Sequence, residues 1–465
     1  MQPKRFFLFG LVLLLAGCST LTPDYHRPAA PVAAAWPGDA PATAGSRPLA
    51  AIPWQEYFLA PQLRQVIDLA LKNNRDLRLA LLNIERARAA YRIQRADLFP
   101  QLDGTGSSTA RHLPADLSGT GRQSTTRQYN VGLGLSAYEL DLFGRVRSLK
   151  DQALQQYLAT AEAQRSVQIS LIAEVAGSYL NLAADQERLQ LAQKTMANQQ
   201  AAYGLVERRY DAGVASALDL QQAKTSVEAA RVDIARYTTL VAQDKNALTL
   251  AAGTTVPAEL LPTSLDQNLT ALTEVAPGLP STVLLARPDI LQAEHQLQAA
   301  NANIGAARAA FFPRITLTGA LGIGSSELSG LFSGGSLTWN FVPQVTVPIF
   351  DAGSSRAGLE VAKVDQKIAV ARYEKAIQIA FGEVADALAR RGTIDEQMAA
   401  QQALTAADAE SYRLSQARYD KGVDSYLNVL DAQRSLFGAR QQLIGTKLVK
   451  FDNLVTLYKA LGGGS

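Results

Sequence analysis

The stretch Arg209-Tyr210-Asp211-Ala212-Gly213-Val214-Ala215-Ser216 recurs later in the chain as Arg418-Tyr419-Asp420-Lys421-Gly422-Val423-Asp424-Ser425. From Arg209 to Arg231, 11 of 23 aligned positions hold the same residue in both copies. Phe99-Pro100 also recurs, as Phe312-Pro313, at a slightly different spacing. Similarity of this extent indicates a duplicated structural unit. The 465 residues, which by length alone would suggest about three domains, are therefore expected to form one repeated unit.

The two copies and the segments around them differ in proline content. We expect a signal peptide over residues 1–17, an arm over 18–62, a first copy over 63–253, a linker over 254–285 and a second copy over 286–462. The arm is rich in proline, which favours extended chain over a folded domain. Both copies are predicted to have the same order of elements: a helix, two strands and a long helical hairpin.

The hairpins occupy stretches without proline in which apolar residues recur at helical spacing. The first long helix is predicted from Arg145 to Tyr210, a length of about 100 Å. Its counterpart is predicted from Ser354 to Tyr419. The returning helices are expected to end at Ala252 and at Leu461, so that each copy forms a hairpin of very long helices.

Both hairpins are predicted to turn at a Gly-Val-x-Ser sequence. Gly213 and Gly422 are expected to end the outgoing helices, because glycine adopts a positive φ without a steric penalty. Ser216 and Ser425 are expected to cap the returning helices, since each is followed three positions later by Asp or Asn.

Each copy is predicted to begin with a shorter helix, over about Leu63–Leu98 and about Pro288–Phe311. Both end at Phe-Pro, because the residue before a proline is disfavoured in the α region. Beyond them, alternating apolar and polar residues predict two strands per copy, and hence four per chain. Four strands with one apolar face cannot close a membrane barrel, which needs about eight. Several chains would therefore have to pool their strands.

Three aromatic residues fall within the predicted strands. Trp339, Phe341 and Tyr129 are candidates for an aromatic belt at the membrane interface. Plain packing against lipid is the alternative.

The N-terminus has the pattern of a secretory signal. Lys4 and Arg5 precede an apolar run from Phe6 to Ala16 that is too short to span a bilayer. The run leads into Leu-Ala-Gly-Cys18, which is similar to the lipobox of bacterial lipoproteins. That resemblance implies that Cys18 carries a covalent lipid and becomes the mature N-terminus; a small buried cysteine is the alternative.

Composition argues against several classes of protein. With 45 basic and 42 acidic residues the formal net charge is +3, which is too small for a nucleic-acid partner. One cysteine and three histidines exclude an internal disulfide framework and zinc sites built from Cys and His. His26, His112 and His295 form no recognisable catalytic motif, and no P-loop or dinucleotide fingerprint is present. We therefore expect no enzyme activity, no metal and no cofactor apart from the lipid.

The lipobox, the Phe-Pro joints and the paired tip sequences together resemble one protein family. Three further motifs strengthen the resemblance: Gly278-Leu279-Pro280-Ser281, Ala286-Arg287-Pro288-Asp289-Ile290, and the ending Leu457-Tyr458-Lys459-Ala460-Leu461-Gly462-Gly463-Gly464. The chain is similar to the outer-membrane factor family of tripartite efflux pumps, which is TolC-like, and is most like the OprM-type lipoproteins.

That resemblance implies a mainly α-helical fold with membrane β-structure. The expected assembly is a homotrimer whose 12-stranded β-barrel, with four strands from each chain, continues into a long periplasmic coiled-coil tunnel. The expected location is the outer membrane, with a lipid anchor and a periplasmic extension. The implied partners are a periplasmic adaptor protein and an inner-membrane RND transporter, and Ser19, where inner-membrane lipoproteins commonly have Asp, agrees with an outer-membrane location.

In this family the closed end of the tunnel lies at the hairpin tips, which implies pore-lining residues within Tyr426–Asp431. Leu427 and Asp431 are four positions apart and share a helix face. In a trimer they would form a ring of apolar residues beside a ring of carboxylates, which would gate the pore and favour cations. Asn428 stands where the family often has a second acid. The alternative makes Asp431 a solvated partner of Arg434 and Leu427 a core residue.

The tip turns hold the remaining candidate residues. Arg418, Tyr419 and Asp424 are candidates for contacts that keep the tips shut, with ordinary packing at a helix end as the alternative for Arg418 and Tyr419. The exposed turns are the candidate adaptor contacts, and their residues are Gly213, Val214, Ser216, Gly422, Val423 and Ser425.

The function expected from these features is a passive exit duct for a multidrug efflux system, gated at the periplasmic tips. Two alternatives remain: the exit channel of a type I protein secretion system, and a lipoprotein scaffold of coiled coils without a pore. The alternating strands argue against the scaffold, because it has no use for a lipid-facing sheet. A hydrolase is the weakest candidate.

Overall fold

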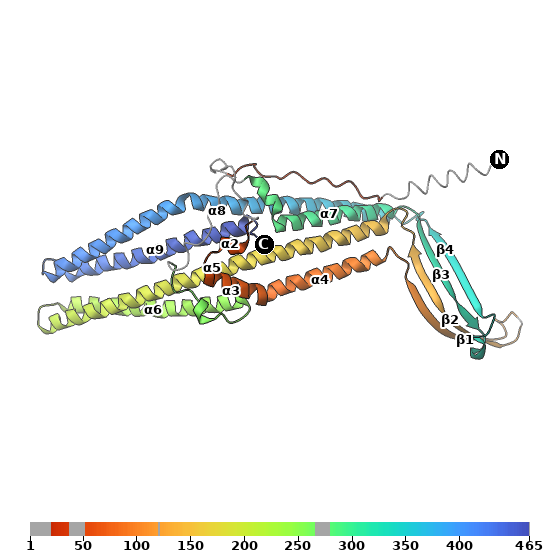
Figure 1. Cartoon of the computed structure of the whole chain (residues 1–465), viewed down its shortest axis with the longest axis horizontal. Coiled ribbons are helices and arrows are strands. Elements are labelled where there is room, and N and C mark those ends of the chain that lie inside the picture. Colours follow the sequence, from red (N-terminus) through yellow and green to blue (C-terminus); the bar gives the residue numbers. More distant parts are fainter. Residues whose placement is uncertain (1–19, 37–51, 120, 266–279, 465) are drawn as a thin grey trace. The chain divides into compact units, whose positions relative to one another are not determined.

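The computed structural model describes residues 20–36, 52–119, 121–265 and 280–464. The predicted signal peptide and the predicted lipidation site at Cys18 lie outside the described residues. The main helices and strands, drawn in Figure 1, are α2 (Trp54–Tyr57), α3 (Pro61–Asn73), α4 (Arg75–Ala96), β1 (Leu102–Leu113), β2 (Ser124–Glu139), α5 (Arg145–Asp211), α6 (Ala217–Ala252), α7 (Pro288–Ala309), β3 (Arg314–Ser325), β4 (Leu337–Thr346), α8 (Ser354–Asp420) and α9 (Tyr426–Ala460).

The predicted order of a helix, two strands and a long hairpin is present twice. In the first copy it is α4, β1, β2, α5 and α6, and in the second it is α7, β3, β4, α8 and α9. The outgoing helices α5 and α8 each have 67 residues, and each ends one residue later than the sequence predicts. In Figure 1 each long helix is followed by a helix that runs back beside it. The hairpin predictions are therefore confirmed.

The single helix predicted over about Leu63–Leu98 is wrong, because the structure has two helices, α3 and α4, which meet at Asn74. Asn74 has an extended backbone with ψ 135, and its side chain accepts hydrogen bonds from the backbone N–H groups of Asp76 and Leu77. Its amide also donates to the Ala251 carbonyl at 2.9 Å. Asn74 thus acts as the N-cap of α4 while it connects this helix start to the end of α6.

The four strands form one antiparallel sheet in the order β1-β2-β3-β4. Within the described chain each of β1 and β4 pairs with only one strand, so both are edges of the sheet. Pro343 lies in the edge strand β4, where proline is tolerated because it cannot donate to a strand ladder. The sheet contains one irregularity, where the pairing of β2 with β3 shifts between Leu135 and Tyr138.

The two faces of the sheet differ in polarity. Register places Leu133, Leu321 and Trp339 on one face, together with the other apolar residues of the alternating pattern. The opposite face carries mainly small and polar side chains, among them Asp103, Asn130, Thr316, Thr318, Asn340 and Gln344. A sheet with one continuous apolar face and one polar face is suited to separate lipid from water.

The chain divides into two compact units that do not follow the two sequence copies. The first takes in the N-terminal segment up to Ala29, Asn83–Ala161 and Gln292–Tyr373, and therefore contains the sheet. The second takes in Ala30–Leu82, Glu162–Leu291 and Glu374–Ser465, and contains the hairpin tips. The long helices α5 and α8 contribute to both units.

In the first unit the segment from Thr20 to Ala29 has no regular secondary structure, as predicted for the arm, and it is tied to α7. Arg27 donates two hydrogen bonds of 2.7 Å to the Glu294 carboxylate, and the Asn301 amide donates to the Pro23 carbonyl at 2.8 Å. The small residue Gly305 lets the chain pass close to α7 at Thr22. These contacts hold residues 22–27 against α7. The prediction of an extended arm is wrong for its last part, because α2 and the start of α3 are helical and the Tyr57 and Phe58 side chains are buried in the second unit.

The core of the second unit is aromatic and lies where the short helices meet the end of α9. The rings of Tyr57, Phe58 and Tyr458 lie with centroids 5.0 to 5.1 Å apart, and all three side chains are fully buried. Part of α5 is apolar enough to span a membrane by length and composition alone, but more than half of that window is buried inside the protein. This stretch of α5 is therefore part of the core.

Candidate functional site at the helix tips

The turns at the two tips have the same backbone geometry. Gly213 and Gly422 adopt φ values of 74° and 73°, as the sequence predicts. The N–H of each glycine bonds to the carbonyl three residues earlier, and the N–H of the following valine bonds to the carbonyl of the arginine five residues earlier, at 2.8 to 3.0 Å. This pair of bonds is the Schellman motif, which closes a helix C-terminus and requires a positive φ at the glycine. Both glycines therefore have a structural role.

The two returning helices begin differently, although their sequences are alike. The Ser216 side chain accepts from the Asp219 backbone N–H at 3.1 Å, and the Asp219 carboxylate accepts from the Ser216 backbone N–H at 3.1 Å, which makes a complete capping box. Ser425 is the N-cap residue of α9, as predicted, but its side chain makes no cap bond. Its expected partner, Asn428, instead interacts with the Asp424 carboxylate.

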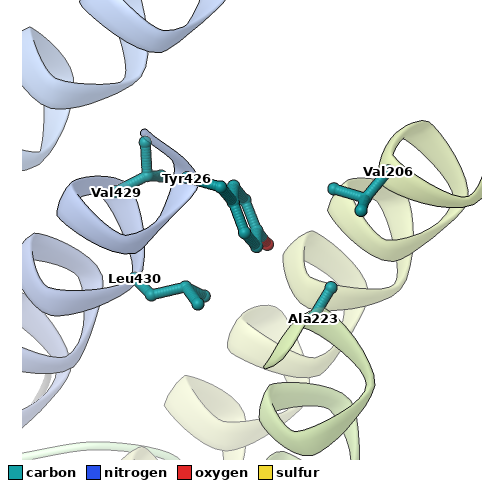
Figure 2. Close-up of a cluster of buried hydrophobic side chains, with 5 residues drawn as sticks. All are labelled: Val206, Ala223, Tyr426, Val429 and Leu430. Atoms are coloured by element: carbon teal, nitrogen blue, oxygen red, sulfur yellow. The ribbon is translucent and has the colours of Figure 1, made fainter. Parts of the chain in front are cut away.

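Behind the turns a small hydrophobic core joins the two hairpins. Figure 2 shows its five buried residues, with the Tyr426 ring of α9 directed toward Val206 of α5 and Ala223 of α6. Val429 and Leu430 complete the cluster from α9. Burial raises the pKa of Tyr426 to about 12, so this side chain is neutral at ordinary pH. The core fixes the start of α9 against the first hairpin.

Tyr419, predicted as a tip-closing residue, packs against this core from α8. Its ring lies 5.3 Å from the Tyr426 ring, and the Arg209 guanidinium of the first hairpin lies 4.9 Å from its centre. A guanidinium over an aromatic face is attracted to it electrostatically. Tyr419 therefore belongs to a contact between the hairpins. Arg209 was missed in the sequence, although its repeat partner Arg418 was singled out.

Arg418 and Asp424, also predicted as tip-closing residues, lie together at the second turn. The Arg418 guanidinium donates two hydrogen bonds to the Asp424 carboxylate, at 2.5 and 3.1 Å. The hydrogen bond from Arg418 is the main reason that the pKa of Asp424 lies below its ordinary value. The first turn has Ala215 at the equivalent position, so the second turn alone carries this charged brace.

Leu427 and Asp431 are exposed on the surface of α9. Leu427 is 45% exposed, so the alternative that places it in the core is wrong for the single chain. The Asp431 carboxylate lies 3.9 Å from the Arg434 guanidinium, and both side chains are more than 60% exposed, which makes this a weak surface pair. The structure thus leaves an apolar side chain and a carboxylate open to solvent within one turn of the helix.

The candidate adaptor contacts are also accessible. Val214 is 71% exposed and Val423 is 61% exposed, so an apolar side chain projects from each turn. Ser216 and Ser425 follow in the same turns, and Gly213 and Gly422 precede them. The structure therefore gathers all the sequence-predicted tip residues at the two turns and the adjoining part of α9.

Apart from Tyr419, the aromatic and apolar side chains of the tip core were not given a role from the sequence. Tyr412 and Tyr419 are seven positions apart on α8, and Tyr426 follows after the same interval. Within one helix, a seven-residue spacing such as that of Tyr412 and Tyr419 places side chains on one face and is typical of helix–helix seams, whereas Tyr426 lies beyond the turn at the start of α9. This signal was available in the sequence.

The histidines contribute to local structure. His112 in β1 lies 2.8 Å from the Thr125 hydroxyl, and His295 in α7 lies 2.8 Å from the Gln155 side chain. Among the residues that the structure describes, no group of three or more His, Cys, Asp or Glu side chains is placed to hold a metal ion.

The sheet has one apolar and one polar face, and the two long helical hairpins pack together at their tips. These features are those of a membrane transport protein of the channel class. The chain belongs to the outer membrane efflux protein family, whose model matches residues 66–254 and 279–463. Its place in the cell is therefore the outer membrane, and its role is that of an efflux duct and not of an enzyme.

Two curated relatives cover nearly all of the chain. A probable efflux pump outer membrane protein, TtgC of Pseudomonas putida, is 53% identical over 97% of this chain and 93% of its own length. The antibiotic efflux pump outer membrane protein ArpC, also of Pseudomonas putida, has the same identity and coverage.

Two solved structures share the fold. A membrane protein from Pseudomonas aeruginosa is 46% identical and superimposes with a TM-score of 0.91, covering 96% of this chain and 98% of that one. The open state of the outer membrane channel MtrE of Neisseria gonorrhoeae is 40% identical, with a TM-score of 0.86 and the same coverage. The mainly α-helical fold with four strands per chain is thus shared with an outer membrane channel.

Proposed function

We propose that this protein is the trimeric outer-membrane exit duct of a tripartite, RND-type multidrug efflux system, gated at its periplasmic helix tips. The observation that carries the proposal is the pair of exposed side chains on α9, Leu427 and Asp431, beside a braced and packed turn. The names of its relatives, which are efflux pump outer membrane proteins, favour this role over a protein secretion exit or a scaffold without a pore.

The trimer follows from the edges of the sheet. In a bilayer the backbone groups at the outer edges of β1 and β4 need partners, because no water is available to them. Four strands are too few to close a barrel, whereas three copies supply twelve. The apolar face would then contact lipid and the polar face would line the aqueous interior.

The gate follows from the position of Leu427 and Asp431 on one face of α9. In a three-fold assembly an apolar ring narrows the pore and excludes water, and a carboxylate ring beside it favours cations. Close carboxylates also repel one another, which opposes the shut state. The Arg418–Asp424 brace and the Tyr426 core would hold α9 in place against that repulsion.

The same proposal covers the anchor and the partners. A lipid on Cys18 would attach the mature N-terminus to the outer membrane and reinforce the insertion of the sheet. Val214 and Val423 are apolar and exposed at the turns, and would be the first residues to contact a periplasmic adaptor, which in turn would connect the duct to an inner-membrane transporter.

The gate is tested by recording from purified protein in planar bilayers. We expect a mostly closed wild type and, for Leu427→Ala/Asp431→Ala, a several-fold larger conductance with weaker cation selectivity. The matched control is Leu218→Ala/Gln222→Ala, which replaces the residues at the equivalent positions of the first hairpin by alanine. Equal conductance in the wild type and the first double variant would remove the gate assignment, and so would an equal effect of the control.

A further inference from the structure

A second group of charged side chains lies at the opposite end of the strands from their hairpin loops, within the unit that contains the sheet. Glu139 is the last residue of β2, Arg145 is the first residue of α5 and Arg314 is the first residue of β3. The group therefore marks the joint at which the strands give way to the helices.

One carboxylate is bound by two guanidinium groups. Arg145 donates to the Glu139 carboxylate at 2.8 and 2.6 Å, and Arg314 approaches the same carboxylate at 2.6 Å. The Glu139 side chain is only 11% exposed, whereas the Arg314 side chain is 56% exposed. Solvent at this site therefore meets mainly guanidinium groups, because the carboxylate lies beneath them.

The register of the sheet decides which way this group faces. Arg314 is paired with Thr346 and Glu139 with Thr316, and these positions belong to the polar face. Glu139 reaches that face because of the irregularity in β2, where Ala137 adopts a φ of 44°. A β-bulge of this kind shifts the alternation by one residue and redirects the side chains that follow. Without it, Glu139 would lie on the apolar face.

The group borders a cavity of about 320 Å³. Arg145 and Arg314 contribute charge to its wall, and Phe143 and Phe312, whose rings are stacked 4.6 Å apart, contribute apolar surface. The other carboxylate in the wall, Asp141, is engaged by Arg147 and by the first backbone N–H groups of α5.

One more carboxylate lies near the group. Asp97 lines a neighbouring cavity that also includes Glu139, Arg145 and Arg314. No ion pair between Asp97 and Arg314 is found among the described residues, and the Arg314 guanidinium, though paired with Glu139, is 56% exposed.

We propose that Arg314, oriented by Glu139, is a selectivity-determining residue of the duct. This inference rests on the proposed trimer, in which three copies of Arg314 form a cationic ring inside the base of the barrel. Such a ring attracts solutes that bear a carboxylate, sulfonate or phosphate group and disfavours cations. Its charge is opposite to that of the Asp431 carboxylates of the proposed gate, so the duct would have two charged rings of opposite sign.

The test is a measurement of reversal potential in planar bilayers under a tenfold KCl gradient, with trimer size and conductance checked for every protein. For Arg314→Gln we expect the ratio of cation to anion permeability to rise by about twofold. The matched control is Arg127→Gln, which removes the same charge from β2 but on the apolar face, where Arg127 pairs with Ala110. We expect this control to keep the wild-type ratio.

A second measurement remains valid if Arg314→Gln fails to assemble. Citrate, a trivalent anion, is added on the barrel side of the wild type and of Arg314→Lys, which keeps the charge without the planar guanidinium. We expect citrate to reduce the single-channel current of the wild type, and to reduce that of Arg314→Lys to a similar or smaller extent.

The outcomes separate the inference from the function on which it rests. A wild-type ratio in Arg314→Gln, an equal shift in Arg127→Gln or a wild-type current that is insensitive to citrate would each overturn the selectivity assignment while leaving the duct intact. If neither the wild type nor Leu427→Ala/Asp431→Ala carried any current, the proposal that the protein is a duct would be wrong, and the selectivity inference would fail with it.

Discussion

Arg418 and Asp424 are joined across the second tip by two hydrogen bonds, whereas Arg209, the repeat equivalent of Arg418, lies over the Tyr419 ring. Two arginines at equivalent positions of a duplicated sequence thus have different partners. One braces its own turn and the other contacts the neighbouring hairpin. The second tip, from which the candidate gate helix α9 begins, is therefore braced by an ion pair within its turn, whereas the first tip is held by the Ser216–Asp219 capping box.

The brace leads to a prediction about opening. Asp424→Asn removes the charge that Arg418 binds, and we expect more frequent channel opening in planar bilayers. The control is Glu410→Gln, which breaks the Glu410–Arg413 pair on the exposed surface of α8, the helix that also carries Arg418. An opening frequency that Asp424→Asn leaves unchanged, or that Glu410→Gln raises equally, would contradict the brace.

The same brace has a predictable dependence on pH. Because the pKa of Asp424 is lowered in the folded protein, its contribution is fully present above the ordinary aspartate pKa and is lost as the pH falls through the lowered value. We expect the difference in opening frequency between the wild type and Asp424→Asn to be constant from pH 5 to 8. It should shrink only in more acidic solution.

The two serines at the tips give a paired test of helix capping. Ser216→Ala removes a complete capping box and is expected to cost about 1 kcal/mol in the local stability of the first turn of α6. Ser425→Ala removes no cap bond and is expected to change little. Amide hydrogen exchange over the first turns of α6 and α9 measures both effects. Equal losses of protection in the two variants would show that the difference in capping is not real in solution.

A carboxylate pair between α5 and α6 gives a prediction about stability and pH. Burial, together with the neighbouring Asp185 carboxylate, raises the pKa of Asp244 to about 6, and Arg188 opposes this shift. The folded state then binds a proton more tightly than the unfolded chain, so stability falls as the pH rises from about 4 to about 6 and is level above that range. We expect Asp244→Asn to abolish this fall.

The size of that effect is limited by solvent, because Asp244 is partly exposed. We expect Asp244→Asn to be more stable than the wild type at pH 7 by about 1 kcal/mol, after discounting for screening. Thermal unfolding midpoints from pH 4 to 8 measure it. Glu228→Gln, which removes an exposed carboxylate from the same helix, is the control and should leave the midpoint profile unchanged. A raised midpoint at pH 7 in the control alone would contradict the assignment.

A buried arginine gives the last prediction. The Arg287 side chain is 7% exposed and binds Asp289 at 2.8 and 3.0 Å, Glu383 at 2.9 Å and the Ala460 carbonyl at 2.5 Å. It therefore connects the start of α7 to α8 and to the end of α9. Arg287→Met removes the charge and these bonds, and we expect a loss of about 3 kcal/mol in stability.

Thermal or denaturant unfolding measures this loss, and two variants provide the comparison. Arg287→Lys keeps the charge but not the planar set of donors, so it should fall between Arg287→Met and the wild type. Arg390→Gln, which removes an exposed arginine from α8, should behave like the wild type. A stability of Arg287→Met equal to that of Arg390→Gln would overturn the role of Arg287 as a connecting residue.

Much of the fold could be predicted from local sequence. The Gly-Val-x-Ser turns fix the ends of the hairpins, because glycine alone takes the positive φ of the Schellman motif without strain. The absence of proline and the spacing of apolar residues give the length of α5 and α8. Alternation gives four strands, and the repeat gives the order of all these elements. The break at Asn74 also had a local signal, since Asn is a favoured N-cap residue and Asp76 falls in the first turn of the helix that follows.

The candidate site could be predicted only in part. Arg418, Asp424, Leu427 and Asp431 were recognised by position in the tip, and the structure gathers them there. The packing of Tyr426 against Val206 and Ala223 was not foreseen, because these residues are far apart in the chain and their contact depends on how two hairpins meet.

By itself the sequence determined what is local or periodic in this protein: the two glycine turns, the long helices between them and the alternation of the strands. Only the tertiary structure decided which residues at equivalent positions of the two copies make different contacts. The Ser216 side chain accepts a cap bond from Asp219, whereas the Ser425 side chain makes none and Asn428 interacts with Asp424. Glu139 lies on the polar face because a bulge shifts its strand by one residue. Such outcomes depend on register and on neighbours distant in sequence, which local spacing does not encode.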